Sequence, residues 1–199
     1  MNLPNRLTVI RIILTPLFML TLVWQFPFHY LVSVLIFIAA SLTDLFDGKI
    51  ARKRGLVTDF GKFLDPLADK MLTTAAFLGF ILLDIGWGSV WIAFIVLFRE
   101  FMVSSIRLIA VSSGGKVIAA NIWGKLKTVF QMIAIIFALV AKQFSEILAL
   151  FRIPDGVLTT VDTVISVATT VLLWVSAVLC VISGAIYLKD NKEFVNHTK

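Results

Sequence analysis

Long apolar runs alternate with short polar segments along almost the whole chain. Each run is close to the roughly 20 apolar residues that a helix needs to cross a bilayer. Helices satisfy their own backbone hydrogen bonds, so they are the form in which such separate runs can cross lipid. We therefore expect an all-α, polytopic integral membrane protein with a single membrane domain over residues 1–199. Its six transmembrane helices are expected over about 7–24, 30–47, 67–83, 89–110, 125–141 and 162–188.

The pattern changes between the fifth and sixth runs. Residues 144–153 form a shorter amphipathic stretch, and a turn signal follows at Pro154-Asp155-Gly156. A short amphipathic helix of this kind lies in the plane of the membrane interface. We therefore expect one interfacial helix between spans five and six. At Asp65-Pro66 we expect another helix to begin, because Asp caps helices and Pro is tolerated in their first turn.

Composition agrees with the membrane assignment. Of the 199 residues, 59% are hydrophobic and 15% are charged, whereas soluble domains average about 45–50% apolar and about 25% charged residues. The single cysteine, Cys180, excludes an internal disulfide and a cysteine-based metal site. Since it lies in an apolar run, we expect it to serve as a small packing residue.

Basic residues are unevenly distributed along the chain, which has a net charge of +6. They gather in 49–62, in 111–127 and after 189, whereas the turns near 26 and 86 hold none. Cytoplasmic loops of membrane proteins carry such an excess of Lys and Arg. We therefore expect both termini to face the cytoplasm. This distribution favours anionic lipid headgroups and phosphate substrates as partners, rather than nucleic acid.

Four carboxylates lie beside the long apolar runs. Asp44 and Asp47 are three residues apart, and Asp65 and Asp69 are four apart, so each pair shares one face of a helix. Carboxylates at membrane depth are costly, and they therefore indicate a functional site. Two such helices side by side would bring the four acids together. The result is an all-oxygen site suited to Mg²⁺ or Mn²⁺.

Small residues and an arginine accompany these acids. Gly48 and Ala51 leave room for a bulky group to approach the second helix, and Gly61 does the same four residues before Asp65. The Arg52 guanidinium can pair with a phosphate. Together they predict a phosphorylated, nucleotide-bearing ligand bridged by divalent metal.

The four acids allow other interpretations. They could be helix caps and solvated loop charges, or the ion pathway of a small cation or proton-coupled transporter. Clustering at one membrane edge, rather than along a span, argues against a transporter. A non-catalytic scaffold would have no reason to keep four acids in one place.

The acids, small residues and arginine form a longer pattern. It reads Asp-Gly-x2-Ala-Arg-x8-Gly-x3-Asp-x3-Asp, with a further Asp three residues before the first, and it resembles the signature of the CDP-alcohol phosphotransferase family. A six-span fold over the whole chain is also what that resemblance implies. The fixed positions are met by Asp44, Asp47, Gly48, Ala51, Arg52, Gly61, Asp65 and Asp69.

Three further segments extend the resemblance: Leu3-Pro4-Asn5-Arg6-Leu7-Thr8-x2-Arg11, Arg99-Glu100 with Ser104-x2-Arg107, and Gly124-Lys125-x-Lys127-Thr128-x2-Gln131. They are similar to the bacterial CDP-diacylglycerol–glycerol-3-phosphate 3-phosphatidyltransferases. This similarity implies an enzyme of the bacterial cytoplasmic membrane, acting on its cytoplasmic side. It would transfer the phosphatidyl group from CDP-diacylglycerol to the sn-1 hydroxyl of glycerol 3-phosphate, giving phosphatidylglycerophosphate and CMP. Inositol phosphate, serine or phosphatidylglycerol are the alternative acceptors.

The resemblance also implies roles for individual residues, and a homodimer. Two divalent cations, Mg²⁺ or Mn²⁺, would be bound by Asp44, Asp47, Asp65 and Asp69. Asp69 would also be the catalytic general base that takes the proton of the glycerol hydroxyl. CDP-diacylglycerol would contact Asn5, Thr8, Arg11, Asp44, Gly48, Arg52, Thr58 and Gly61. The acceptor phosphate would meet Lys62, Arg99, Arg107, Lys125 and Lys127, with Arg107 and Lys125 as the preferred pair.

The basic side chains of this group also allow a purely structural interpretation. Arg99 and Glu100 could be a self-neutralising pair that only packs helices, and Arg107, Lys125 and Lys127 could be cytoplasmic anchors. On the opposite side of the membrane we expect His29 to be structural. Glu146, Asp155 and Asp162 are expected on that side too, away from catalysis.

Overall fold

The computed structural model describes residues 3–54, 59–112, 122–151 and 154–191. Side chains are described over the same ranges, except for 3–4, 44–54, 59–63, 65–66, 69 and 110–112. Within the described residues the fold is all-helical, as predicted. Its six helices are α1 (Leu3–Val23), α2 (His29–Arg54), α3 (Asp59–Leu82), α4 (Ser89–Ser112), α5 (Ile122–Leu150) and α6 (Asp155–Asp190).

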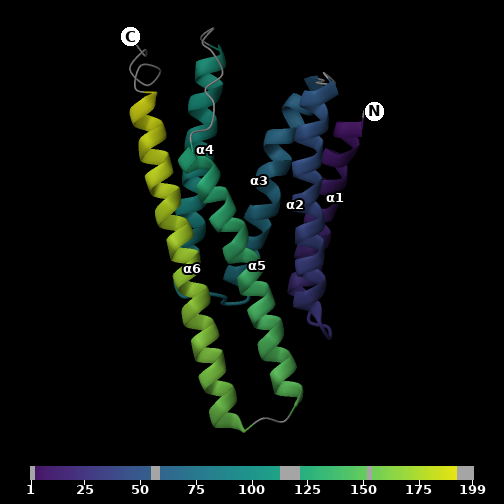
Figure 1. Ribbon diagram of the computed structural model, residues 1–199, viewed down its shortest axis with the longest axis vertical. Helices are drawn as coiled ribbons and strands as arrows, with labels where there is room; N and C mark the ends of the chain where they lie inside the picture. The colour runs from purple at the N-terminus through teal and green to yellow at the C-terminus, as the bar shows by residue number, and fades with distance from the viewer. Residues whose placement is uncertain (1–2, 55–58, 113–121, 152–153, 192–199) are drawn as a thin grey trace.

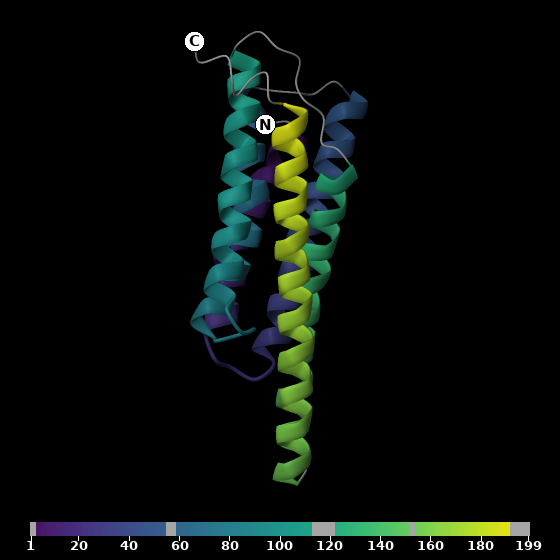
Figure 2. The same ribbon diagram turned by 90° about the vertical axis from the view of Figure 1, so that its left-hand side faces the viewer.

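The helices run along one long axis and form two neighbouring groups (Figure 1). In one group α1 packs against both α2 and α3, and in the other α6 packs against both α4 and α5. The groups meet where α2 contacts α5 and where α3 contacts α4. Figure 1 shows α5 and α6 extending past the other helices, away from the labelled chain ends, and Figure 2 shows the extension of α6 from the side.

The two ends of this bundle hold different parts of the chain. At one end, which we call the motif end, α1 begins, α2 ends, α3 begins and α6 ends (Figure 1). The other end, which we call the far end, holds the turns at 24–28 and 83–88. Both described chain ends therefore lie at the motif end, as the six helices of the described residues require when they run alternately up and down.

Aromatic and aliphatic side chains fill the interior. Phe18, Phe37, Phe77 and Phe80 are fully buried, and Cys180 is a buried free thiol among them, which confirms its packing role. The outer surface is apolar as well, because many large hydrophobic side chains of α4 and α6 are exposed. A bundle that is apolar on its outside is suited to a lipid surround rather than to water.

The far-end turn at 83–88 depends on glycine and on contacts with α6. Gly86 and Gly88 have φ values of 79° and 74°, a backbone region that favours glycine. The Trp87 amide donates to Thr170 Oγ1 at 2.9 Å, and Trp174 Nε1 donates to the Trp87 carbonyl at 3.1 Å. These bonds hold the predicted tight turn against α6.

Three helices, α1, α5 and α6, are long and apolar enough to cross a membrane. Shorter apolar segments occur in α2 at His29–Thr43 and in α3 at Lys70–Leu82. These findings fit a membrane protein, while the full set of six spans stays a prediction.

Two expectations about helix ends differ from the structure. The interfacial helix over 144–153 is not a separate element, because α5 continues unbroken to Leu150; no proline or glycine interrupts it, and its buried face continues to Gln143. The expected helix start at Asp65-Pro66 is wrong, because α3 already begins at Asp59. A proline removes one backbone bond but can be accommodated inside a packed helix, as Pro16 is in α1.

Candidate active site

The two halves of the acidic motif lie at the motif end of the bundle. Asp44 and Asp47 belong to the last turns of α2, and Asp65 and Asp69 to the first turns of α3. Only residues 55–58 separate these helices, and both helices pack against α1. The fold therefore brings the two segments of the motif to the same end of the bundle.

The side chains of this motif lie outside the described residues, so their predicted convergence on metal remains a prediction. Among the described side chains, no group of three or more His, Cys, Asp or Glu could hold a metal ion. The donor chemistry of the motif, four carboxylates on two adjoining helices, fits hard divalent cations. The residues concerned are Asp44, Asp47, Gly48, Ala51, Arg52, Thr58, Gly61, Lys62, Asp65 and Asp69.

The first helix turns a polar face into the bundle at this end. Asn5, Thr8 and Arg11 follow one another at intervals of three, and all three are buried. Arg11 is only 1% exposed, although it sits in an apolar helix. Because α1 packs against α2 and α3, this face points into the bundle beside the helices that carry the motif. That is the side on which the sequence predicts the CDP pocket.

A buried ion pair joins α4 to α5. Lys127 Nζ donates to Glu100 Oε1, and Arg99 Nη1 lies 3.4 Å from the same oxygen. Arg99 Nη2 donates to Ser183 Oγ of α6 at 2.7 Å. Gly184, the next residue, lets α6 approach closely, since a Cβ there would lie 3.1 Å from Arg99 Cγ. Arg99 and Glu100 thus tie α4 to α5 and α6, as the structural alternative for this pair predicted. Their contact with the acceptor phosphate stays a prediction.

A second contact joins α4 to α3. Lys70 Nζ donates to Ser104 Oγ, and Ser104 Oγ donates to the Glu100 carbonyl at 2.8 Å. Lys70 directly follows the motif residue Asp69 in α3. We call the whole set the Glu100 cluster; it consists of Lys70, Arg99, Glu100, Ser104, Lys127 and Ser183.

The predicted acceptor cations separate into two groups. Arg99 and Lys127 are buried, at 8% and 7% exposure, and both contact Glu100. Arg107 and Lys125, the preferred pair, are exposed. We call Arg99 and Lys127 the inner cations. Buried cations act through a lower dielectric than exposed ones, and which of the predicted cations meets the acceptor phosphate stays a prediction.

Sequence reasoning missed Lys70 and Ser183. Lys70 carried a usable signal, because a lysine inside a predicted span is a functional-site candidate by default. Ser183 carried none, since serine is common at helix contacts in membranes. The pairing of Glu100 with Lys127, 27 residues later, depends on how α4 and α5 face each other.

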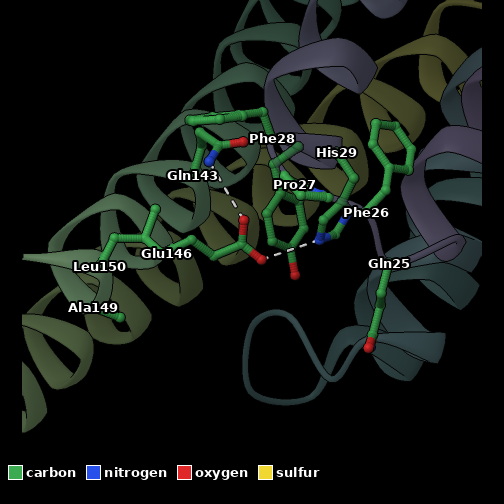
Figure 3. A pocket seen from close by; sticks show the side chains of 10 residues that line it. Gln25, Phe26, Pro27, Phe28, His29, Gln143, Glu146, Ala149 and Leu150 are labelled. Atoms are coloured by element: carbon green, nitrogen blue, oxygen red, sulfur yellow. Dashed lines mark hydrogen bonds and ion pairs between the residues drawn. The ribbon is translucent and has the colours of Figure 1, made fainter.

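A cavity of about 520 Å³ lies at the far end (Figure 3). There His29 Nε2 lies 3.1 Å from Glu146 Oε1, and Gln143 Nε2 donates to Glu146 Oε2 at 3.4 Å. Gln143 Oε1 also accepts the Leu31 amide at 2.9 Å. These contacts tie α2 to α5, in agreement with the structural role predicted for His29.

An all-helical bundle with long apolar helices and the acidic motif at one end defines a membrane-embedded class of protein. The sequence model of the CDP-alcohol phosphatidyltransferase family matches residues 1–182. The chain belongs to that family.

Named relatives cover nearly the whole chain. It is 38% identical to the CDP-diacylglycerol–glycerol-3-phosphate 3-phosphatidyltransferase of Bacillus subtilis (strain 168), over 96% of each chain. It is 34% identical to the enzyme of that name from Rickettsia bellii (strain RML369-C), over 97% of each chain. A probable phosphatidylglycerophosphate synthase of Mycobacterium tuberculosis (strain ATCC 25618 / H37Rv) is 41% identical over 67% of this chain and 64% of its own.

Proposed function

We propose that this protein transfers the phosphatidyl group from CDP-diacylglycerol to the sn-1 hydroxyl of glycerol 3-phosphate. The products are phosphatidylglycerophosphate and CMP, so the reaction belongs to phospholipid biosynthesis. The relatives' names support this reaction, because the similarity extends over nearly the whole chain. The observation that carries the proposal is the position of both motif segments at one end of the bundle, beside buried cations.

The divalent cations would be held by Asp44, Asp47, Asp65 and Asp69. When bound, they supply positive charge that neutralises the diphosphate and stabilises the leaving CMP. Arg52 and the buried Arg11 would orient the diphosphate through charge-assisted hydrogen bonds.

Asp69 would take the proton of the acceptor hydroxyl as the general base. The freed oxygen attacks the phosphorus that carries the diacylglycerol, and the bond from that phosphorus to the oxygen of CMP breaks. The negative charge leaves with CMP. Positioning of the two substrates supplies much of the remaining rate enhancement.

The acceptor phosphate would be held by the inner cations Arg99 and Lys127, and the exposed Arg107 and Lys125 would draw it toward the site. Lys is a compact point charge and Arg a planar fork, and both suit a phosphate. The motif end would face the cytoplasm, where glycerol 3-phosphate is dissolved. We also propose a homodimer, for which the exposed Phe94, Phe98 and Phe101 of α4 offer an apolar face.

An acceptor assay tests this function. Purified protein in detergent micelles containing CDP-diacylglycerol is given glycerol 3-phosphate, serine, inositol phosphate or phosphatidylglycerol, and release of CMP is measured. We expect release with glycerol 3-phosphate alone. Release with another acceptor and none with glycerol 3-phosphate would overturn the substrate assignment but keep the reaction class. Cation flux into liposomes without CDP-diacylglycerol would favour the transporter instead.

A further inference from the structure

One turn of α4 gathers basic side chains from the helices on either side of it. Glu100 Oε1 accepts a hydrogen bond from the ammonium of Lys127, which belongs to α5, and lies 3.4 Å from Arg99 Nη1. Ser104 Oγ, one turn further along α4, accepts a hydrogen bond from the ammonium of Lys70, which belongs to α3. Lys70 and Lys127 therefore approach the same turn of α4 from different helices.

Burial makes the contact between Glu100 and Lys127 restrictive. The side chain of Lys127 is 8% exposed and that of Glu100 is 15% exposed. A lysine on the surface would move freely on its four-carbon stem. Here the carboxylate holds the ammonium at one place, and leaving either charge without its partner inside the bundle would be costly. The ammonium is therefore fixed before any ligand arrives.

The cluster leads directly to the motif. Ser104 Oγ accepts from Lys70 and donates to the Glu100 carbonyl at 2.8 Å. Lys70 is the residue after Asp69, the proposed general base. A continuous series of contacts thus runs from Lys127 on α5, across one turn of α4, to the residue beside Asp69.

We propose that Glu100 is a positioning residue for the phosphate of the acceptor. Its carboxylate fixes Lys127 so that this ammonium, together with Lys70, meets the acceptor phosphate beside Asp69; Glu100 itself touches neither substrate. The inference rests on the proposed function and adds Lys70 and Glu100 to it. The alternative is that Glu100 only ties α4 to α5.

Kinetics of Glu100 variants test the inference. Glu100→Gln keeps the shape and an acceptor oxygen but removes the charge that fixes Lys127. We expect kcat/KM for glycerol 3-phosphate to fall on the order of 100-fold, the cost of misplacing a reacting group by about 1 Å. The KM for CDP-diacylglycerol should stay unchanged, and Glu100→Asp, which keeps the charge, should recover part of the loss. Glu146→Gln, a matched change at the far end, should leave both parameters at the wild-type value.

A charge exchange separates positioning from helix tying. The double variant Glu100→Lys with Lys127→Glu restores an ion pair between α4 and α5 but moves the ammonium to the other helix. We expect its melting temperature to recover relative to the single variants while kcat/KM for glycerol 3-phosphate stays low. Recovery of both would overturn the inference, and so would an unchanged kcat/KM in Glu100→Gln. A wild-type protein that releases no CMP with glycerol 3-phosphate would overturn the proposed function as well, whereas an active wild type with an unaffected Glu100→Gln variant would overturn the inference alone.

Discussion

Two glutamates tie α5 to its neighbours, one toward each end of the bundle. Glu100 of α4 pairs with Lys127 in the second turn of α5, and Glu146 near the end of α5 pairs with His29 of α2. The side chain of Glu100 is 15% exposed, whereas that of Glu146 is 42% exposed and borders a cavity. Only the first pair adjoins the acidic motif, through Ser104 and Lys70.

The two pairs separate two roles of a polar contact inside a membrane protein, namely stability and turnover. Hydrogen bonds between membrane helices contribute about 0.6 kcal/mol on average, because the separated helices find other partners. Stability alone is thus a weak reason for the far-end contacts, whereas separating the buried charges of Glu100 and Lys127 would be costly. Location distinguishes them: changes at the motif end should alter turnover, and changes at the far end should alter only stability.

Metal removal should have the largest effect. The motif supplies four carboxylates, and no other group of three or more metal-binding residues is found among the described side chains. We expect EDTA to reduce CMP release to background, and added Mg²⁺ or Mn²⁺ to restore it. As a control, the difference in melting temperature between wild type and the far-end variant Glu146→Ala should be the same with and without EDTA. Full turnover in EDTA after exhaustive dialysis would contradict the metal assignment.

Asp69→Asn should come next. The amide keeps the shape of the side chain but loses its charge and basicity, and general base catalysis contributes about 10²–10⁴-fold. We expect CMP release to fall by that factor while the helical circular dichroism spectrum is retained. Asp84→Asn is the matched control, because Asp84 is an exposed aspartate in the far-end turn. Turnover near the wild-type rate in the Asp69 variant would mean that another group takes the proton.

The sequence predicted the family and the positions of the helices. Eight motif positions at fixed spacing pointed to the family, which the family match confirms. Each predicted span overlaps one helix of the described residues, and the helices extend beyond the spans: α2 continues to Arg54 and α6 begins at Asp155. Hydropathy measures how much of a helix is apolar, whereas the helix itself continues through polar residues until a turn interrupts it.

Partners across helices were harder to predict than the helices themselves. Arg99 and Glu100 are adjacent, which suggested a pair, yet Glu100 binds Lys127 and Arg99 also binds Ser183. Which residue meets which depends on the rotation of α4, α5 and α6 about their axes. Small residues such as Gly184 decide that rotation by allowing close approach. No local pattern in one sequence reports it.

A glycine substitution should destabilise the bundle without touching the chemistry. A Cβ at Gly79 of α3 would lie 2.3 Å from Leu22 Cδ2 of α1, and Leu22 is fully buried. We expect Gly79→Ala to lower the free energy of unfolding by about 1–3 kcal/mol, the usual cost of overpacking, measured as a lower melting temperature. Gly156→Ala is the control, since nothing lies within 4 Å of its Cβ position. A Gly79→Ala variant as stable as wild type would show that α1 and α3 can separate slightly at no cost.

The smallest effect is expected at the far-end glutamate. Glu146→Ala removes the partner of both His29 and Gln143, and such contacts in membrane bundles contribute about 0.6 kcal/mol and at most about 1.7 kcal/mol. We expect a slightly lower melting temperature and unchanged kcat/KM for both substrates. Gln143→Ala should lower the melting temperature further, because it also leaves the Leu31 amide without its acceptor. A loss of turnover in Glu146→Ala at constant stability would erase the distinction between the two ends and assign the far-end cavity a part in the reaction.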